Sequence, residues 1–571
     1  MSDFSRIPVY NLEIDLPRCG NIYGSAPCTA SGAAGSECYN TYKTCQDKTN
    51  FTLTTQTVAY CSAGAPLPAG QLVRPYIKPK AGVQLPPIEI DPRAGLAPRS
   101  TCTVALYDEP CPDHDMDPYH ATRATPATGT YWGRLLARHH NLSNLTARIK
   151  RAYFTDGWDE SEFITETYIL ETIRGPNGSD GVVVTLKDPI KLTDRMLLPP
   201  PSPGKLAVAL GTNDLSLTLD SGSGASYGAT GYVRVKGQII RYTSNVGDVL
   251  SWPDSTYRSQ FDTTAEAAEV GDVVQECIVY IDEPFSGVVE DINNRSGIAD
   301  ANIDLAGIQS EDDRWLGSAY LITTCLHEPT KASDYLQELS QETGGVIWWD
   351  PVAAKVKYKY IGPESPAALT GATLTDEANI IDGSVKVDPL DDLRLTRAYV
   401  GYSLANATAN LNESKNFLGG RGYIDADAES PLEYNDVRSD VMYSRWFTTP
   451  NERGVTAFVK RRVGQYRDVP RNISLRVDAK DADIREADLY DVTTRSVVDE
   501  TGAPRTIRCL VIKRKDNGNG LDLTLRTTNF SRRYGFIAPN GTSDYPDNAD
   551  YACICLNTGK FSDGSSGYLI I

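Results

Sequence analysis

Short runs in which apolar and polar residues alternate recur along most of the sequence, and a period of two is typical of β-strands. Two hairpins are indicated, at residues 175–178 and around Lys236 and Gly237, because Gly and Asn accept tight turns. The pattern predicts strands over residues 9–16, 56–61, 83–90, 101–109, 148–154, 163–174, 231–242, 346–350, 355–360, 393–402, 456–463, 473–477, 506–513 and 520–526.

Helical periodicity is confined mainly to residues 285–345. Residues 331–343 give the clearest case, because Leu336 and Leu339 share one face. Ser333 can cap this helix at its start, and Gly344 can end it. Few helices among many strands predict a mainly β, multi-domain chain of the α+β kind.

The length of 571 residues allows several domains, each with its own core. Hydrophobic residues make up 40 % and charged residues 23 %, and the 31 tyrosines favour strands. No apolar stretch approaches the ~18 residues that would cross a bilayer. The four prolines within residues 196–204 interrupt regular structure and indicate a domain edge.

The formal net charge of −18 opposes a general nucleic-acid binder, which would carry a basic face. An acidic chain does suit a surface past which DNA slides without sticking, because like charge raises the cost of phosphate contact.

Four cysteines near the N-terminus are the strongest candidate site. Cys19, Cys28, Cys38 and Cys45 follow the spacing C-x8-C-x9-C-x6-C, and the segments between them are rich in small residues. These segments contain too few apolar side chains to form a core of their own, so we expect a covalent or metal cross-link to hold them. Disulfides need an oxidising compartment, and the first residues do not resemble a secretory signal. Zinc prefers tighter Cys pairs, whereas an iron–sulfur cluster accepts irregular spacing. Spacing leaves cluster, zinc, disulfide and unconnected thiols open.

The pair Cys38 and Cys45, followed by a polar turn and Phe51, resembles the iron–sulfur segment of the lambdoid minor tail protein L family. The resemblance implies a four-iron (4Fe–4S) cluster on Cys19, Cys28, Cys38 and Cys45, with zinc as the alternative metal. The nine-residue gap between Cys28 and Cys38 is shorter than that pattern leads one to expect.

A second resemblance is to the tail hub proteins of long-tailed phages. It is carried by residues 107–109 (Tyr-Asp-Glu), 115–119 (Asp-Met-Asp-Pro-Tyr), 129–138 (Gly-Thr-Tyr-Trp-Gly-Arg-Leu-Leu-Ala-Arg), 185–193 (Thr-Leu-Lys-Asp-Pro-Ile-Lys-Leu-Thr), 314–316 (Arg-Trp-Leu), 327–330 (His-Glu-Pro-Thr) and 348–351 (Trp-Trp-Asp-Pro). The resemblance implies a virion structural protein of the tail tip or baseplate, assembled in the host cytoplasm. It implies a homotrimeric ring that continues the tail tube, with DNA crossing the lumen during genome ejection. Its expected partners are the distal tail protein and tail tube above, a central tip or fibre protein below, and the tape measure protein in the lumen.

Six segments are expected from pattern and resemblance together. They are a Cys-rich iron–sulfur module (1–95), a first hub β-barrel (96–200), a β insertion (201–280), a helical and β-hairpin connecting domain (281–369), a second hub β-barrel (370–535) and a C-terminal docking tail (536–571).

Other candidate chemistry is weaker. Asp113, Asp115 and Asp117 alternate as in a calcium loop, but the Gly and terminal Glu of an EF-hand are missing. Cys111, His114 and His120 lack a second tight pair for zinc, and Pro329 breaks any helix that would present His327 and Glu328 to a metal. Eight further cysteines are scattered along the chain, apart from the close pair Cys553 and Cys555, and most of the eight are expected to be reduced and buried.

No Gly-x-Ser-x-Gly elbow and no P-loop occurs, and the glycines of residues 221–228 lack the dinucleotide spacing. The sequence therefore favours a protein that is not an enzyme. An iron–sulfur redox protein and a tail-borne peptidoglycan hydrolase acting through two carboxylates are the alternatives.

Overall fold

The computed structural model describes residues 8–31, 38–68, 72–79, 82–91, 93–111, 116–123, 128–153, 158–178, 181–317, 320–361, 372–448, 452–517 and 520–528, with three short strands beyond. Within these residues the chain is mainly β and is built from several separate sheets around one helical unit. The expected fold class is confirmed. No helix of the described part is both long and apolar enough to cross a membrane.

Seven strands of the N-terminal third close into a β-barrel. Its order is β3 (Val73–Ile77), β2 (Leu53–Ser62), β1 (Val9–Cys19), β7 (Thr146–Ala152), β8 (Ile164–Arg174), β9 (Val182–Lys187) and β6 (Thr101–Leu106). The barrel closes because β3 also pairs with β6, through Ile77 and Leu106. β4 (Val83–Gln84) adds to the other part of β6.

The barrel interior follows the sequence alternation. Leu12, Ile14 and Leu16 of β1 are buried. The short helix α1 (Tyr131–Arg138) packs on this core, where Tyr131 Oη lies 2.7 Å from the hydroxyl oxygen of Tyr60. Strands from both sides of residue 95 thus share one core, so the structure does not divide the chain there as expected. Pairing between β1 and β7 joins residues far apart in sequence.

The β insertion has a core of its own, formed by residues from Leu206 to Val274. Its strands are β11 (Ser216–Thr218), β12 (Gly231–Val235), β13 (Gln238–Tyr242), β14 (Ser244–Val246), β15 (Val249–Ser251) and β16 (Val274–Pro284). β12 and β13 form the predicted hairpin, with Val235 opposite Gln238. β16 pairs in turn with β17 (Leu321–Leu326) and leads into the central unit.

The central unit holds the largest core of the described chain. Its helices are α2 (Phe285–Arg295), α3 (Leu305–Trp315) and α4 (Ala332–Thr343), and its strands are the hairpin β19 (Gly345–Asp350) and β20 (Lys355–Tyr360), with the short pair β10 (Leu197–Leu198) and β18 (Thr330–Lys331). The helix expected over residues 331–343 is confirmed. It ends at Gly344, whose φ of +83° is the left-handed conformation that glycine adopts readily.

Residues 397–466 also pack on this central core. β23 (Arg397–Leu404) lies between β24 (Phe417–Ile424) and β25 (Ser439–Tyr443), and α5 (Glu452–Tyr466) covers them. The strand expected over residues 456–463 is therefore wrong. Val455, Phe458, Val459 and Val463 are all buried, and their spacing places them on one helical face.

The C-terminal sheet has the order β21 (Thr373–Thr375), β27 (Leu489–Val498), β28 (Pro504–Asp516), β29 (Gly520–Thr527), β26 (Arg471–Asp478) and β22 (Lys386–Pro389). No pairing among the described residues joins β21 to β22, so this sheet is open there. The expected second barrel over residues 370–535 is thus divided between this sheet and the segment packed on the central core. β30 (Gly535–Ile537), β31 (Ile554–Cys555) and β32 (Tyr568–Ile570) form a further small sheet.

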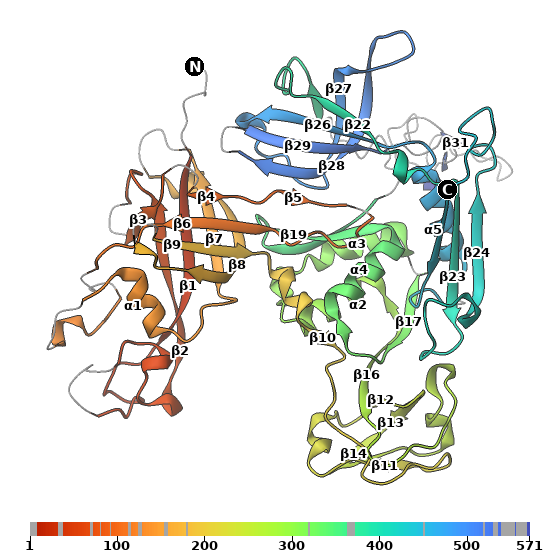
Figure 1. Ribbon diagram of the computed structural model, residues 1–571, viewed down its shortest axis with the longest axis horizontal. Coiled ribbons are helices and arrows are strands. Elements are labelled where there is room, and N and C mark those ends of the chain that lie inside the picture. The colour runs from red at the N-terminus through yellow and green to blue at the C-terminus, as the bar shows by residue number, and fades with distance from the viewer. Residues whose placement is uncertain are drawn as a thin grey trace, which may run out of the picture.

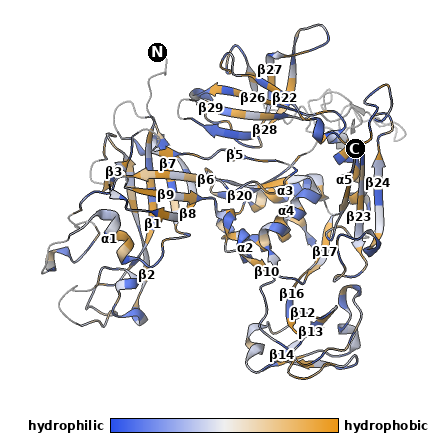
Figure 2. Ribbon diagram, viewed as in Figure 1, coloured by the Kyte–Doolittle hydropathy of each residue, from blue (hydrophilic) through white to orange (hydrophobic). Residues whose placement is uncertain are grey.

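One extended segment links the barrel to the C-terminal sheet. β5 (Ile88–Glu89) leaves the barrel and pairs with β28, and Lys513 contacts Glu89 at 2.6 Å while Arg526 contacts Asp91 at 3.0 Å. In Figure 1 the barrel lies to the left, the C-terminal sheet above and the insertion below the central helices. Figure 2 shows hydrophobic residues gathered in the strands and helices that face these cores.

Candidate metal centre

The four cysteines lie at the end of one barrel strand and in the two loops that follow it. Cys19 ends β1, Cys28 lies in the loop after it, and Cys38 and Cys45 flank a 3-10 turn, η1 (Tyr42–Thr44). The N–H of Cys19 donates to the carbonyl of Asn40 at 3.0 Å, so the second loop is held against the end of β1. The structure therefore brings the four predicted residues into one region.

Their thiols act on one another electrostatically. Burial raises the pKa of the Cys38 thiol, and the neighbouring thiols of Cys45, Cys19 and Cys28 raise it further, because a second negative charge nearby opposes ionisation. Burial likewise raises the pKa of Cys45, with Cys19 and Cys28 contributing. Cys38 is buried and the other three are half-buried.

The thiols are nevertheless spread out. Among the residues that the structure describes, no three His, Cys, Asp or Glu side chains are close enough to hold a single metal ion. The four thiols are thus electrostatic neighbours that do not form the ligand set of a single metal ion. Every one of them is free of a disulfide.

Hydrogen bonds from the barrel fix both loops. Thr41 is buried and its hydroxyl donates to the carbonyl of Arg138, at the end of α1, at 2.7 Å. The N–H of Tyr23, in the first loop, donates to the Tyr119 hydroxyl at 2.9 Å. The sequence predicted that a cross-link between the cysteines holds these loops. In the structure, hydrogen bonds to residues of the barrel unit also hold them.

Arg123 contacts the backbone of one of the four candidate ligands. Its Nη2 donates to the carbonyl of Cys38 at 2.6 Å, and Nε and Nη2 donate to the Asp117 carboxylate at 2.7 and 2.9 Å. Its guanidinium carbon lies 4.0 Å from the ring centre of Tyr39, which Arg138 also approaches, at 4.2 Å. Asp117 is thus a buried ion-pair partner, and the calcium interpretation of this residue is wrong; Asp113, Asp115 and His114 lie outside the described residues.

Positive charge gathers on this side of the barrel although the chain carries a net charge of −18. The pKa of His139 is lowered to about 4, first by burial and then by Arg18, Arg138 and Lys43. An anionic group between the cysteines would therefore meet basic neighbours.

Cys111 lies in the barrel core and the ring Nδ1 of His120 lies 3.1 Å from the carbonyl of Asp117, so these two residues serve the local fold. Of the cysteines expected to be reduced and buried, the six described outside the candidate site are confirmed as such: Cys61, Cys102, Cys111, Cys277, Cys325 and Cys509. Cys553 lies outside the described residues, and Cys555 lies on β31.

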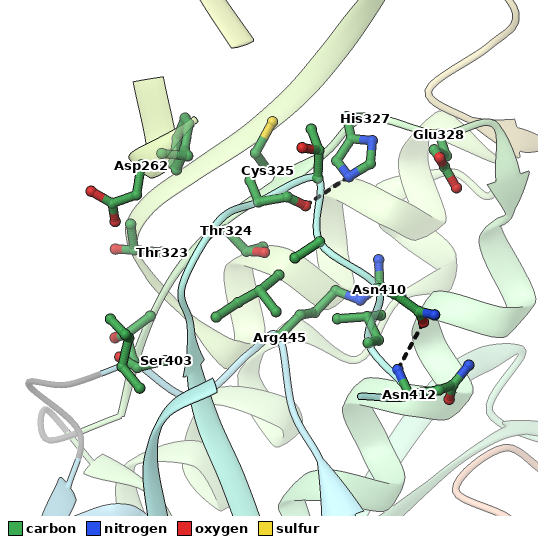
Figure 3. A pocket seen from close by; sticks show the side chains of 18 of the residues that line it. Asp262, Thr323, Thr324, Cys325, His327, Glu328, Ser403, Asn410, Asn412 and Arg445 are labelled. Carbon is green, nitrogen blue, oxygen red and sulfur yellow. Dashed lines mark hydrogen bonds between the residues drawn. The ribbon is translucent and has the colours of Figure 1, made fainter. Parts of the chain in front are cut away.

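A separate pocket of about 640 Å³ lies between β17 and the loop that joins β23 to β24 (Figure 3). His327 connects its two walls: Arg234 donates to Nδ1 at 3.1 Å, and Nε2 therefore carries the proton that it donates to the carbonyl of Ala407 at 2.8 Å. Both ring nitrogens are engaged, so His327 holds these two segments together. Burial lowers the pKa of this imidazole, and Arg234 lowers it further.

The pocket is polar, and two of the charged residues that line it, Arg445 and Glu328, are paired. Arg445 donates to Glu338 at 2.8 Å, and Arg234 donates to Glu328 at 2.7 Å. Nothing in this arrangement resembles a nucleophile with a base beside it.

No family model and no curated protein matches this sequence. Among solved structures, the 43 kDa tail protein of prophage MuSo2 from Shewanella oneidensis is similar over 78 % of this chain and 94 % of that one, at 9 % identity and a TM-score of 0.36. A tail protein from Neisseria meningitidis MC58 covers 78 % of this chain and 95 % of its own, at 10 % identity and a TM-score of 0.36. The prophage tail protein gp18 from Listeria monocytogenes EGD-e covers 68 % and 86 %, at 11 % identity and a TM-score of 0.28.

Proposed function

We propose that this protein is a structural component of a phage tail tip, a baseplate hub that forms a ring in line with the tail tube. The observation that carries the proposal is the presence of two β units in one chain, the closed N-terminal barrel and the C-terminal sheet, joined side by side through β5. Three copies would present six such units, which matches the sixfold symmetry expected of a tube above the ring. The ordered motifs of the tail hub resemblance support the same conclusion.

The ring is tested by the mass and shape of the purified full chain. Light scattering after gel filtration should give about three times the 62.4 kDa of the chain, and electron microscopy should show closed rings with pseudo-sixfold outlines. A monomer at all concentrations, or an open filament, would contradict the proposal.

We assign a structural iron–sulfur cluster to Cys19, Cys28, Cys38 and Cys45. The donor set suits it, since iron–sulfur clusters are held by four thiolates. A single zinc ion bound by the same cysteines is the alternative. When bound, the cluster supplies a cross-link between the two loops. The chain's own residues supply the ligands and the basic surroundings.

Metal analysis of anaerobically purified protein tests this assignment. Iron and acid-labile sulfide should both be present and should be lost in Cys38→Ser. The buried thiol of Cys509, in the C-terminal sheet, gives the control variant Cys509→Ala, which should retain both. Zinc without sulfide would contradict the cluster while leaving the cross-link in place.

The proposed role places the tube and distal tail protein above the ring, a central tip or fibre below it, and the tape measure protein and then DNA in its lumen. An acidic lumen would let DNA pass, because each inward Lys or Arg adds drag by releasing counterions. The basic residues Arg148 and Lys150 fit this, since both pair with carboxylates of β1. Retention of DNA by the purified ring should therefore be negligible even at low salt, and salt-sensitive retention would contradict this.

A further inference from the structure

Arg123 has a buried donor that the protein does not use. Its Nη1 is inaccessible to solvent and has no hydrogen-bond partner among the described residues. The same side chain is only 12 % exposed, and its Nε and Nη2 donate hydrogen bonds to Asp117 and to the carbonyl of Cys38. A buried donor without an acceptor is destabilising, so an acceptor is expected in the assembled protein.

The candidates for this acceptor are few. The Asp117 carboxylate already takes two bonds from the guanidinium, and the Tyr39 ring lies against its face. The Arg123 charge also interacts with the Cys38 thiol. A sulfur of a bound cluster would be an anionic acceptor next to a residue that is otherwise fully engaged.

We propose that Arg123 is a positioning residue of the iron–sulfur site, whose Nη1–H donates a hydrogen bond to a sulfur of the cluster or of its Cys38 ligand. This inference rests on the cofactor proposed above. Arg123 thereby acts in two ways: its bond to the Cys38 carbonyl fixes the ligand loop, and its charge and N–H offset the negative charge of the thiolates. Hydrogen bonds to the sulfurs and nearby charge are among the factors that set the reduction potential of such clusters.

The chain offers a matched control. Arg99 makes the same bidentate contact with Asp194, in which Nε and Nη2 donate to the carboxylate at 3.1 and 2.7 Å. Its Nη1 donates to the carbonyl of Ala97. It belongs to the segment that leads into β6 of the same barrel, and the cysteines are not among its contacts. Substitutions at Arg99 therefore report the general cost of losing such an ion pair.

The experiment compares the wild type with Arg123→Lys, Arg123→Gln, Arg99→Lys and Arg99→Gln as full-length, anaerobically purified proteins. Two quantities are measured: the midpoint potential in a dithionite titration followed by absorbance, and the rate of iron release to a chelator. Arg123→Gln should shift the potential to more negative values and release iron about 10-fold faster. Arg123→Lys keeps the positive charge but loses the planar guanidinium with its several N–H donors. The midpoint potential of the cluster in this variant should therefore lie between those of Arg123→Gln and the wild type. Both Arg99 variants should match the wild type.

Equal potentials and release rates in the wild type and all Arg123 variants would overturn the inference while the cluster itself stands. A wild type free of iron and sulfide would overturn the cofactor as well. If Arg123→Gln holds no cluster at all, the comparison of Arg123→Lys with the wild type tests the inference. A midpoint potential and an iron-release rate equal to those of the wild type would contradict the hydrogen bond to sulfur. Pulsed EPR of the reduced wild type gives a further test, since a strongly coupled exchangeable proton should disappear in Arg123→Lys.

Discussion

Replacing Asp516 by Asn tests how the N-terminal barrel is held to the C-terminal sheet. Asp516 on β28 pairs with Arg151 on β7, and the two side chains are only 5 % and 4 % exposed. A second guanidinium, that of Arg514, lies 3.6 Å from the same carboxylate. The amide would keep the shape of the side chain and remove its charge.

The expected cost follows from what the substitution leaves behind. Two buried guanidinium groups would lose their shared carboxylate, and Nε of Arg151 already has no partner among the described residues. Breaking a buried ion pair by neutralising one partner costs about 3–5 kcal/mol. Asp388 gives the control, because it pairs with Lys386 at 2.8 Å in the same sheet with side chains 44 % and 72 % exposed. Such exposed pairs contribute about 0–1 kcal/mol.

Urea unfolding should therefore show a clearly earlier first transition for Asp516→Asn than for Asp388→Asn. Hydrogen exchange should report faster opening at β7 and β28, since the pair joins these strands. Equal transitions in the two variants, or exchange that rises only far from the interface, would refute the reasoning. In that case β5 and its pairing would account for the attachment.

Further predictions concern pH, packing and backbone conformation. Burial raises the pKa of Glu486 from 4.5 to about 7. Between these two pH values the folded protein keeps a proton on Glu486 that the unfolded chain releases. The contribution of Glu486 to the free energy of unfolding is therefore fully present below about pH 4.5 and is lost as the pH rises to about 7. Glu486→Gln should flatten that part of the urea-midpoint profile, and an unchanged profile would count against the assignment. Phe458→Ala, on the buried face of α5, should cost about 3–5 kcal/mol, whereas Leu432→Ala, at 95 % exposure, should be neutral by the same measurement. Gly181→Ala should lower the melting temperature more than Gly178→Ala: both residues have positive φ, but only at Gly181 would the added Cβ collide with a backbone oxygen, that of Leu106. Equal losses would show that φ alone matters.

The sequence predicted most strands and the helix over residues 331–343, because local periodicity reports which face of an element is buried. It failed at α5, where Val455, Val459 and Val463 suggested a strand. Their burial at intervals of four fits a helix, and the tertiary context of β23 and β24 outweighs the β preference of valine. The division at residue 95 failed for another reason. Barrel closure depends on pairing between distant strands, which no local pattern reports.

Only some residues of the candidate site could be predicted from the sequence. The four cysteines could be named from their spacing and resemblance, and the structure brings them together. Arg123, Tyr39 and Asp117 could not be assigned to the site, because the contact between Arg123 and Cys38 spans 85 positions of the chain. The alternating acids near residue 115 were visible, but without the Gly and Glu of an EF-hand loop they gave no firm assignment. A basic residue six positions after Asp117 was the only sequence signal for the ion pair that the structure shows.

The way the two cysteine loops are held indicates what a cluster would add. The barrel secures the first loop through Tyr119 and the second through Arg123 and Arg138. Between the two loops, the hydrogen bonds of Asp47 with Thr29 and of Tyr23 with Gln46 are solvent-exposed, and the bond from Asn21 to the carbonyl of Asn50 is partly buried. Such bonds contribute only about 0.5–1.5 kcal/mol each. A four-thiolate cross-link would therefore act mainly between the loops. Its loss should weaken the contact between residues 20–31 and 38–50, which would then rest on these few hydrogen bonds. The strands β1 and β2 and the rest of the barrel should stay folded, because their core of Leu12, Tyr60 and Trp132 does not include the four cysteines.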